Sequence, residues 1–589
     1  MHDRWITDWP PSIRWPHYTR ANAGEVLPTP ASPLGQQFTW DLGICPGWRD
    51  GYVRGGCTTL DEYTDAPPAA CGFFGGYFYI NLSNVRMQGV RSPIVTVEQL
   101  DLAFFGDHPD VPPYVAHPDD DRPELVPRVL EHLGWVMTAT SWPEIDDEKT
   151  QTRALRAARP DLTTLSDVEL VALARTHQPM LRKLFESHTV SSGSSGIAPG
   201  ILGVIGEAIG DPTIPMKLVA GIGDVDSAEP NYALWDLSRM VRSSSELTSA
   251  FDLGLGDVIQ RLEASGSADA GAFLDAGRAF LLEFGSRGPN EWEMSAETWE
   301  TKPALALAAL DRIRLQDDDE SPRIRNAARV AEREQMTVEV RAKLAALGNE
   351  ELSGQFEAAL AASRQLAFRE RTKTNIIRVV HEGRMIFREL GRRHAEAGNL
   401  ADASHIFMLL DQELESFAAD PASMRDVLVG RFAGWQELWL LVPPFFIVDG
   451  KVPPLSQWAR KGASRAIAAV EGEVLTGVAG SPGIVQGRAR VILDPADPTA
   501  LEPGDILVAP LTDPAWTPLF MAAGGVIVNV GGQISHAIIV SRELGLPCIV
   551  SVTDATERIP DGALVEMDGN TGRITVLSVP TVVAVGAAR

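Results

Sequence analysis

One histidine in this 589-residue chain stands in a sequence context that could support group transfer. His536 closes the segment 531–536, GGQISH. The two glycines allow a sharp turn and a close approach to a ligand, and Ser535 is a good helix N-cap. A histidine in the first turn of a helix lies beside free N–H groups and the positive end of the helix dipole, where phosphate binds. His536 could therefore bind a metal, transfer protons, pack structurally or carry a phosphoryl group.

The residues around His536 favour a phosphoryl carrier over a metal site. No second His or Cys lies at metal-ligand spacing, and the nearest carboxylate belongs to Glu543. A carrier needs a neutral imidazole nitrogen as nucleophile and groups that stabilise the anionic product. The turn at Gly532 and Ser535 supplies such groups, and Arg542 further along is a candidate phosphate partner. We predict no metal site.

A buried strand and an amphipathic helix are expected to position this histidine. Residues 525–530, GVIVNV, are apolar and rich in β-branched residues, which predicts a strand. Residues 537–544 have helical periodicity. His536 would therefore lie in the first turn of a helix, where the chain leaves a sheet.

The segment around His536 resembles the phosphohistidine signature of the phosphoenolpyruvate-utilising enzymes. This family includes pyruvate phosphate dikinase, phosphoenolpyruvate synthase, rifampicin phosphotransferase and phenylphosphate synthase. The resemblance continues in order through the segments GVAGSPGIVQG, GDILVAPLTDPAWTP, GLPCIV and DGALVEMDGNTG, at residues 477–487, 504–518, 545–550 and 561–572. These segments are similar to the family's swivelling domain.

The resemblance implies that His536 is phosphorylated by one substrate and dephosphorylated by another. It also implies that Thr512, in the second segment, joins Gly532, Ser535 and Arg542 in positioning the phosphate. At one position the chain departs from much of the family. Ile534 stands where the synthases and dikinases usually carry Thr, and an aliphatic residue there is closer to the rifampicin phosphotransferase branch.

Composition excludes several classes of function. With 44% apolar and 22% charged residues, the chain has ample material for roughly three or four soluble domains. The net charge of −26 argues against nucleic acids and anionic membranes as partners. Four scattered cysteines fit a reduced compartment, and the sequence lacks an apolar signal core or membrane span. We expect a cytoplasmic protein.

The expected fold class is multidomain α+β, with a mostly helical substrate-binding body followed by a C-terminal α/β swivelling phosphohistidine domain. The Trp-, Pro- and Gly-rich start predicts irregular and β structure, with one clear strand at 77–82. The box Ser166–Glu169 opens a helix that is expected to run toward His188, and residues 459–470 predict a short helix. The predicted divisions are a β-containing start, a helical acceptor-binding domain, a linker, the swivelling domain and a tail, at residues 1–95, 96–420, 421–472, 473–578 and 579–589.

Two segments before the linker, each with charged candidate site residues, also resemble this family. Residues 280–299 are similar to its Gly-x-Arg-Gly stretch with following glutamates, although Ser286 stands where a His is common. The candidate acceptor-site residues there are Arg287, Glu291 and Glu293. Residues 18–34 resemble the head of the substrate-binding part of rifampicin phosphotransferase. Glu25 in this segment is either catalytic or caps a turn.

Residues 366–414 match the family's pattern and predict a helix with charges on its apolar side. At about 100° per residue, one arc collects the apolar residues Phe368, Ile376, Val379, Val380, Ile386, Phe387 and Leu390. Arg369, Lys373 and Arg384 fall within this arc or on its edge, and Arg388 is a further candidate. Charges on an apolar face are costly unless they are paired. Their partner is either a phosphoryl group or internal carboxylates such as Glu291 and Glu293.

Two expected domains of the family have no counterpart in the sequence. It contains no Gly-x-x-x-x-Gly-Lys-[Ser/Thr] loop, no segment like the ATP-grasp domain and no phosphoenolpyruvate-binding barrel. We therefore expect a subunit of a dikinase-type phosphotransferase that binds no cofactor tightly. A separate ATP-grasp partner with ATP and Mg²⁺ would load His536.

The phosphoryl group would then pass to a hydroxyl of a small organic acceptor, giving AMP, phosphate and a phosphorylated product. A phenol is one candidate acceptor, because 14 Trp and 20 Phe can line an aromatic pocket, although such residues also build cores. An alcohol or an antibiotic hydroxyl is equally compatible. A non-catalytic regulatory or scaffold protein that keeps the carrier fold is the competing hypothesis. A phosphoenolpyruvate-linked phosphocarrier is a further alternative.

Overall fold

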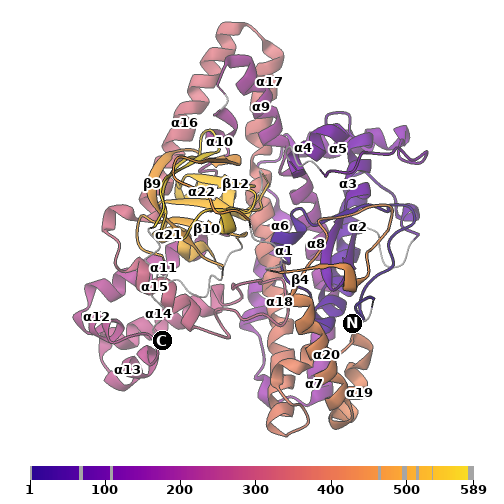
Figure 1. Ribbon diagram of the computed structural model, residues 1–589, viewed down its shortest axis with the longest axis vertical. Coiled ribbons are helices and arrows are strands. Elements are labelled where there is room, and N and C mark those ends of the chain that lie inside the picture. Colours follow the sequence, from indigo (N-terminus) through magenta and orange to yellow (C-terminus); the bar gives the residue numbers. More distant parts are fainter. Residues whose placement is uncertain are drawn as a thin grey trace, which may run out of the picture.

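The structure is a computed structural model in which an α/β unit lies against a mainly helical body (Figure 1). The α/β unit, drawn in orange and yellow, stands beside the long central helix α18. Its residues come from the C-terminal part of the chain, whereas the body contains the rest. The described residues are 3–64, 70–105, 110–211, 213–223, 225–461, 466–493, 501–512, 516–532 and 535–580.

Helix α18 (Arg364–Glu396) runs through the middle of the body, and its 33 residues contain no proline. The seven apolar residues of the predicted arc are all buried, so this part of the periodicity analysis is confirmed. Gly391 lets residue Ala403 cross the helix closely, because a Cβ at that glycine would lie 2.2 Å from the Ala403 oxygen. Neither α18 nor another helix among the described residues is apolar enough over a sufficient length to cross a membrane.

A second helix, α8 (Gln178–Ser194), packs between α18 and α2 (Cys45–Arg54). The predicted capping box is present at the start of α7 (Asp167–Arg175). The expectation of one helix reaching His188 is wrong, because α7 ends at Arg175 and α8 begins anew. Pro179 explains the break, since proline lacks the N–H that a continuing helix needs.

The N-terminal part contains helices as well as the expected strands. The predicted strand at 77–82 is present as β3 (Tyr77–Asn81). With β1 (Tyr18–Thr19), β2 (Cys71–Phe74) and β5 (Phe446–Ile447) it forms an antiparallel sheet in the order β2-β3-β1-β5. The helical segments α1, η1, α2 and α3 were not predicted, and they lie at Ala23–Val26, Gly35–Ile44, Cys45–Arg54 and Leu82–Arg91.

The glycines of this region account for the difference. Glycine-rich sequence predicts irregular structure, but Gly47 and Gly51 lie inside α2 where it meets α8. A Cβ at Gly47 would stand 2.3 Å from the carbonyl oxygen of Arg182. The glycines therefore serve close helix packing rather than chain reversal.

Most of the segment predicted as a linker belongs to the body. Helix α20 (Arg425–Trp439) buries Trp435 in the same core as strand β5, which pairs with β1. The short helix expected at 459–470 is wrong as well. Ala459–Arg460 forms strand β6, which pairs with β4 (Leu441–Val442), and the described residues that follow are not helical. Strand pairing outweighs the local helix propensity of this alanine-containing segment.

The α/β unit is built on an eight-stranded sheet in the order β7-β14-β13-β9-β10-β11-β12-β8. Its four central strands are parallel to one another: β9 (Ile484–Val491), β10 (Ile506–Ala509), β11 (Gly525–Val528) and β12 (Cys548–Val550). Each flanking strand pairs antiparallel with its inner neighbour, and these strands are Val474–Thr476 (β7), Val478–Ser481 (β8), Leu564–Asp568 (β13) and Arg573–Ser578 (β14). The strand predicted at 525–530 is thus present, but it ends at Val528.

The helix predicted at 537–544 is present as α22 (His536–Leu544). It connects β11 to β12 and so begins beyond the carboxyl end of a parallel strand. Ligands commonly bind at that end of an open α/β sheet. Helix α21 (Thr517–Ala522) connects β10 to β11. The turn residues Gln533 and Ile534 lie outside the described residues.

The α/β unit packs on the body helices α11 (Glu229–Ser243), α15 (Ala304–Ile313) and α16 (Pro322–Leu347). One hydrophobic core contains apolar side chains of α15 together with Trp516 and Phe520 of the α/β unit. This shared core holds the unit against the body, with α22 facing inward.

Candidate active site

His536 is the first residue of α22 and is buried, with 8% of its surface exposed. The predicted neighbour Thr512 is present, because its Oγ1 lies 3.3 Å from Nδ1 of the histidine. Ser535 occupies the N-cap position, but its side chain makes no capping hydrogen bond, contrary to expectation. Its Oγ is buried and has no hydrogen-bond partner among the described residues. The hydroxyl is therefore available to an anion bound at the histidine.

Three cations of the body act on His536. Burial and the positive charges of Lys373, Arg287 and Arg369 place the pKa of His536 well below its ordinary value. Lys373 and Arg369 are one turn apart on α18, whereas Arg287 lies in the loop after α14 (Ala268–Phe284). The imidazole is therefore neutral at physiological pH, as a nucleophilic carrier requires.

Glu291 balances part of this positive charge. One carboxylate oxygen lies 3.1 Å from Nε of Arg287, and the other lies 3.6 Å from Nζ of Lys373. The Arg287 Nη1 group donates to Thr374 Oγ1 at 3.2 Å. Its Nη2 group is buried and makes no hydrogen bond with a described residue. One carboxylate thus faces several cations, which leaves donor capacity for a second anion.

Glu25 reaches the site from the short helix α1. The carboxylate accepts a hydrogen bond from the backbone of Gly532, in the turn before His536. Burial raises the pKa of Glu25 to about 7, although Arg369 and Lys373 oppose this rise. The sequence allows Glu25 to be catalytic or to cap a turn. The geometry places it in the site, next to the histidine turn, rather than at an isolated turn.

Arg384 and Glu293, two further candidates, hold the loop that presents Glu291. The guanidinium of Arg384 donates to the carbonyl oxygens of Glu291, Glu293 and Met294 at 2.7, 2.9 and 3.1 Å. The expected pairing of Arg384 with carboxylates is therefore wrong, since its donors reach main-chain oxygens. The Glu293 carboxylate accepts from Ser32, with an Oγ–Oε1 distance of 2.5 Å, and from Ser295. Both side chains position the loop.

Arg388 and Arg542 lie away from this group, so two expectations are corrected. Arg388 pairs with Glu297 near the surface, at 3.2 Å. It is fifteen residues beyond Lys373, or about 22 Å along the helix. The Nε of Arg542 donates to the Gly480 carbonyl at 2.8 Å, inside the α/β unit. Six helical residues rotate a side chain by about 240°, which turns Arg542 away from His536.

His188 belongs to the site but was not selected from sequence. Its Nδ1 lies 3.0 Å from Thr372 Oγ1, and burial with nearby Arg369 and Lys373 lowers the pKa of His188 to about 3. Its ring lies near Trp292, with centroids 6.2 Å apart. A lone histidine on an amphipathic helix carries no signal of its own, because the residues that it meets lie far along the chain. Ser286, where the family commonly has His, is buried in the same loop as Arg287.

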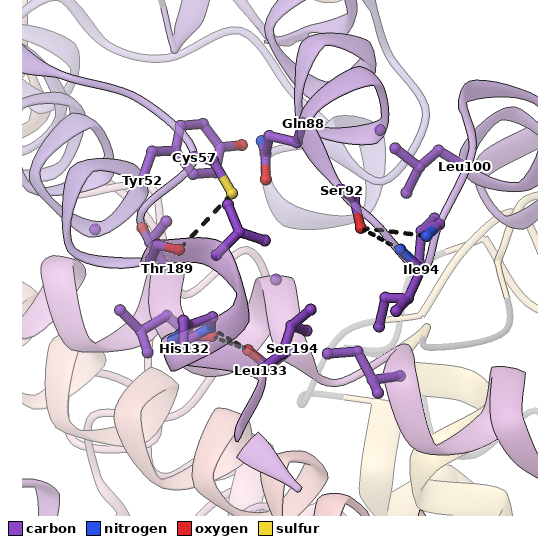
Figure 2. A pocket seen from close by; sticks show the side chains of 18 residues that line it. Tyr52, Cys57, Gln88, Ser92, Ile94, Leu100, His132, Leu133, Thr189 and Ser194 are labelled. Atoms are coloured by element: carbon purple, nitrogen blue, oxygen red, sulfur yellow. Dashed lines mark hydrogen bonds between the residues drawn. The ribbon is translucent and has the colours of Figure 1, made fainter. Parts of the chain in front are cut away.

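A separate cavity of about 120 Å³ lies on the other side of α8 (Figure 2). It is mostly apolar and takes part of its wall from α2 and none from α18. Thr189 and Ser194 of α8 face it, and Ser194 Oγ lies 3.0 Å from Nε2 of His132. His188, by contrast, faces Thr372 on α18. Helix α8 therefore separates this cavity from the histidine site.

Two family models match separate parts of the chain, one in the helical body and one in the α/β unit. Residues 188–370 match the family model of the rifampicin phosphotransferase fourth domain. Residues 501–572 match the mobile domain of the PEP-utilising enzymes. The first match includes His188, Arg287, Glu291 and Arg369, and the second includes His536.

Several curated proteins are similar over half of the chain or more. A rifampicin phosphotransferase of Streptomyces sviceus is 31% identical over 60% of this chain and 40% of its own length. The uncharacterized phosphotransferase YvkC of Bacillus subtilis is 28% identical over 60% of this chain and 42% of its own. The prodigiosin synthesizing transferase PigC of Serratia marcescens is 30% identical over 51% of this chain and 33% of its own.

The chain thus spans less than half the length of each of these relatives. The two family-model matches nevertheless include residues from both parts of the site, the carrier histidine and the cationic body. The chain thus contains the mobile domain of the phosphoenolpyruvate-utilising enzymes and is related to rifampicin phosphotransferase.

Proposed function

We propose that this chain carries a phosphoryl group on His536 and transfers it to a hydroxyl of a small organic acceptor bound by the helical body. The observation that carries the proposal is the position of a neutral, buried imidazole facing Lys373, Arg287 and Arg369. A phosphoryl group on the ring would bring negative charge to these cations. Fixed charges of this kind stabilise the transition state of phosphoryl transfer.

The transfer step assigns a role to the residues that contact the histidine. With Nδ1 engaged by Thr512, we assign the phosphoryl group to Nε2. The N–P bond breaks as the acceptor oxygen forms the new O–P bond. The acceptor's proton passes to Glu25 and from Glu25 to the ring of His536, which leaves as neutral imidazole while Glu25 returns to a carboxylate. With its pKa raised to about 7, Glu25 is suited to act as a general base near neutral pH.

Loading of His536 requires a second position of the α/β unit. A histidine that is 8% exposed inside the body is shielded from a nucleotide site on another unit. We propose that an ATP-grasp partner, with ATP and Mg²⁺, phosphorylates His536 after the α/β unit has swung out. The full reaction would then be of the dikinase type and would release AMP and phosphate.

The aromatic side chains beside the site support a ring-bearing acceptor such as a phenol. Phe185 and Trp292 both lie near His188, with ring centroids 5.3 and 6.2 Å away. The Nε1 group of Trp292 is buried and has no hydrogen-bond partner among the described residues. An aromatic acceptor could stack here while its oxygen accepts from the indole.

Phosphorylation of His536 is the test of the carrier role. The chain is incubated with its ATP-grasp partner and ATP labelled at the β-phosphate, or with phosphoramidate, which phosphorylates histidine directly. We expect an acid-labile, base-stable label that is absent from His536→Ala and retained in His117→Ala, a control at a half-exposed surface histidine. Label retained by His536→Ala would overturn the proposal, and an unmodified chain that takes up no label would favour the scaffold hypothesis.

A further inference from the structure

The helix that carries His536 is also held by the body at its opposite end. Arg329 of α16 donates from Nη2 to the carbonyl oxygen of Gly545, which caps α22, at 3.0 Å. Asn326 donates from Nδ2 to Glu543 Oε2 at 3.1 Å. The backbone of Gly221 also hydrogen-bonds the Glu543 carboxylate. These contacts join the body to the last turn of α22.

The fit at this end of α22 is close. Asn326 and Arg329 are three residues apart on α16, so they lie on the same face of that helix. Gly545 has a φ of +70°, and a Cβ there would stand 2.9 Å from Nε of Arg329. The left-handed backbone therefore favours glycine at this position, and the missing Cβ leaves room for the guanidinium of Arg329.

Two side chains of α22, Glu543 and Ile539, are buried against the body in the docked position of the α/β unit. Glu543 is 5% exposed, and a buried carboxylate is costly unless hydrogen bonds satisfy it. Ile539, one turn earlier on α22, packs into the body core with Met336 and Val340 of α16. Movement of the α/β unit away from the body would expose the carboxylate and the isoleucine together.

We propose that Asn326 and Arg329, acting on Glu543 and the Gly545 carbonyl, form a docking latch that sets His536 in its transfer position. The inference rests on the proposed function, because it assumes that the histidine visits a second site. Glu25 contacts the turn before α22 and the latch contacts its end, so the helix axis is fixed at both ends. Asn326 and Arg329 are positioning residues, since they touch α22 and not the reacting atoms.

The latch sets the balance between docked and undocked chains. One hydrogen bond corresponds to about a 3- to 10-fold change in such an equilibrium. Loss of either latch residue should therefore raise the undocked fraction by that factor. Transfer should slow, whereas loading, which needs the undocked chain, should not.

Chemical modification of His536 measures docking without a partner or an acceptor. Diethyl pyrocarbonate modifies exposed neutral imidazole, and mass spectrometry of the His536 peptide gives the rate in the full chain. We expect Arg329→Met and Asn326→Ala each to speed this modification by about 3- to 10-fold. Arg323→Met is the matched control, because it lies on the same helix in an exposed ion pair with Asp236 and should leave the rate unchanged.

His381, which is fully buried in the body, separates undocking from unfolding. Its modification should stay slow in the latch variants. If Arg329→Met also speeds modification of His381, the milder Asn326→Ala decides by the same criterion. Unchanged His536 rates in the folded latch variants, or an equal increase in Arg323→Met, would overturn the latch. Because no phosphorylation is measured, this result is independent of whether His536 carries phosphate.

Discussion

Three cations lie on or beside the apolar face of α18: Arg369 and Lys373 toward its start, and Arg384 further along. We call them the charged stripe, and its two ends have different partners. Nearer the start of the helix, Lys373 and Arg369 act on His536, and Lys373 shares the buried carboxylate of Glu291 with Arg287. At the other end, Arg384 donates hydrogen bonds to three main-chain oxygens, and its Nη1 lies 3.0 Å from Nδ1 of His381. Cations on or beside one apolar helix face thus serve binding or scaffolding, depending on the acceptors that the fold supplies.

The loop at 291–294 is held in place by Arg384 and Glu293. Arg384 fixes the carbonyl groups of the loop, and Glu293 ties it to Ser32 and Ser295. The loop then presents Glu291 to Arg287 and Lys373. A rigid loop keeps the cations at a set distance from His536, which is what preorganised charge stabilisation requires.

The largest expected effect is the loss of the scaffolding end. Arg384→Met should lower the free energy of unfolding by about 3–5 kcal/mol, because several buried carbonyl groups lose their donor. A thermal or denaturant melt measures this. Arg388→Met on the same helix removes only a surface ion pair and should cost less than about 1 kcal/mol. Equal stability of the two variants would contradict the structural role of Arg384.

Glu25→Gln should slow transfer from phosphorylated His536 by about 10²- to 10⁴-fold, the usual contribution of a general base. The pKa of Glu25 is about 7, and only the deprotonated carboxylate accepts a proton. In the unmodified chain the transfer rate should therefore rise as the pH increases through about 7 and then level off. A single-turnover pH profile that keeps this rise in Glu25→Gln would remove Glu25 from the mechanism.

The part of the α/β unit around His536 could be predicted from local signals in the sequence, whereas the rest of the unit was expected from the family resemblance. The glycine turn, the β-branched run and the helical period after Ser535 together place His536 at the start of α22. The apolar arc of α18 was found for the same reason, since its residues repeat with the helical period.

The rest of the site depends on contacts between distant parts of the chain. Glu25 meets Gly532 only when the α/β unit is docked, and no local pattern links these residues. Periodicity placed Arg384 on the buried face but could not show that its acceptors are carbonyl oxygens. Residues 425–460 were expected to form a linker but belong to the body. This also depends on a contact between distant parts of the chain, because β5 pairs with a strand near the N-terminus.

The most direct test of the account compares transfer and stability in Lys373→Met. The full chain is phosphorylated on His536 with phosphoramidate, mixed with phenol as the probe acceptor, and followed through a single turnover beside a thermal melt. We expect the variant to melt nearly as the unmodified chain does and to lose about 2–4 kcal/mol of transition-state stabilisation, while Arg388→Met discharges normally. A Lys373→Met chain that melts much earlier yet discharges at the unmodified rate would contradict the account and make both ends of the stripe scaffold.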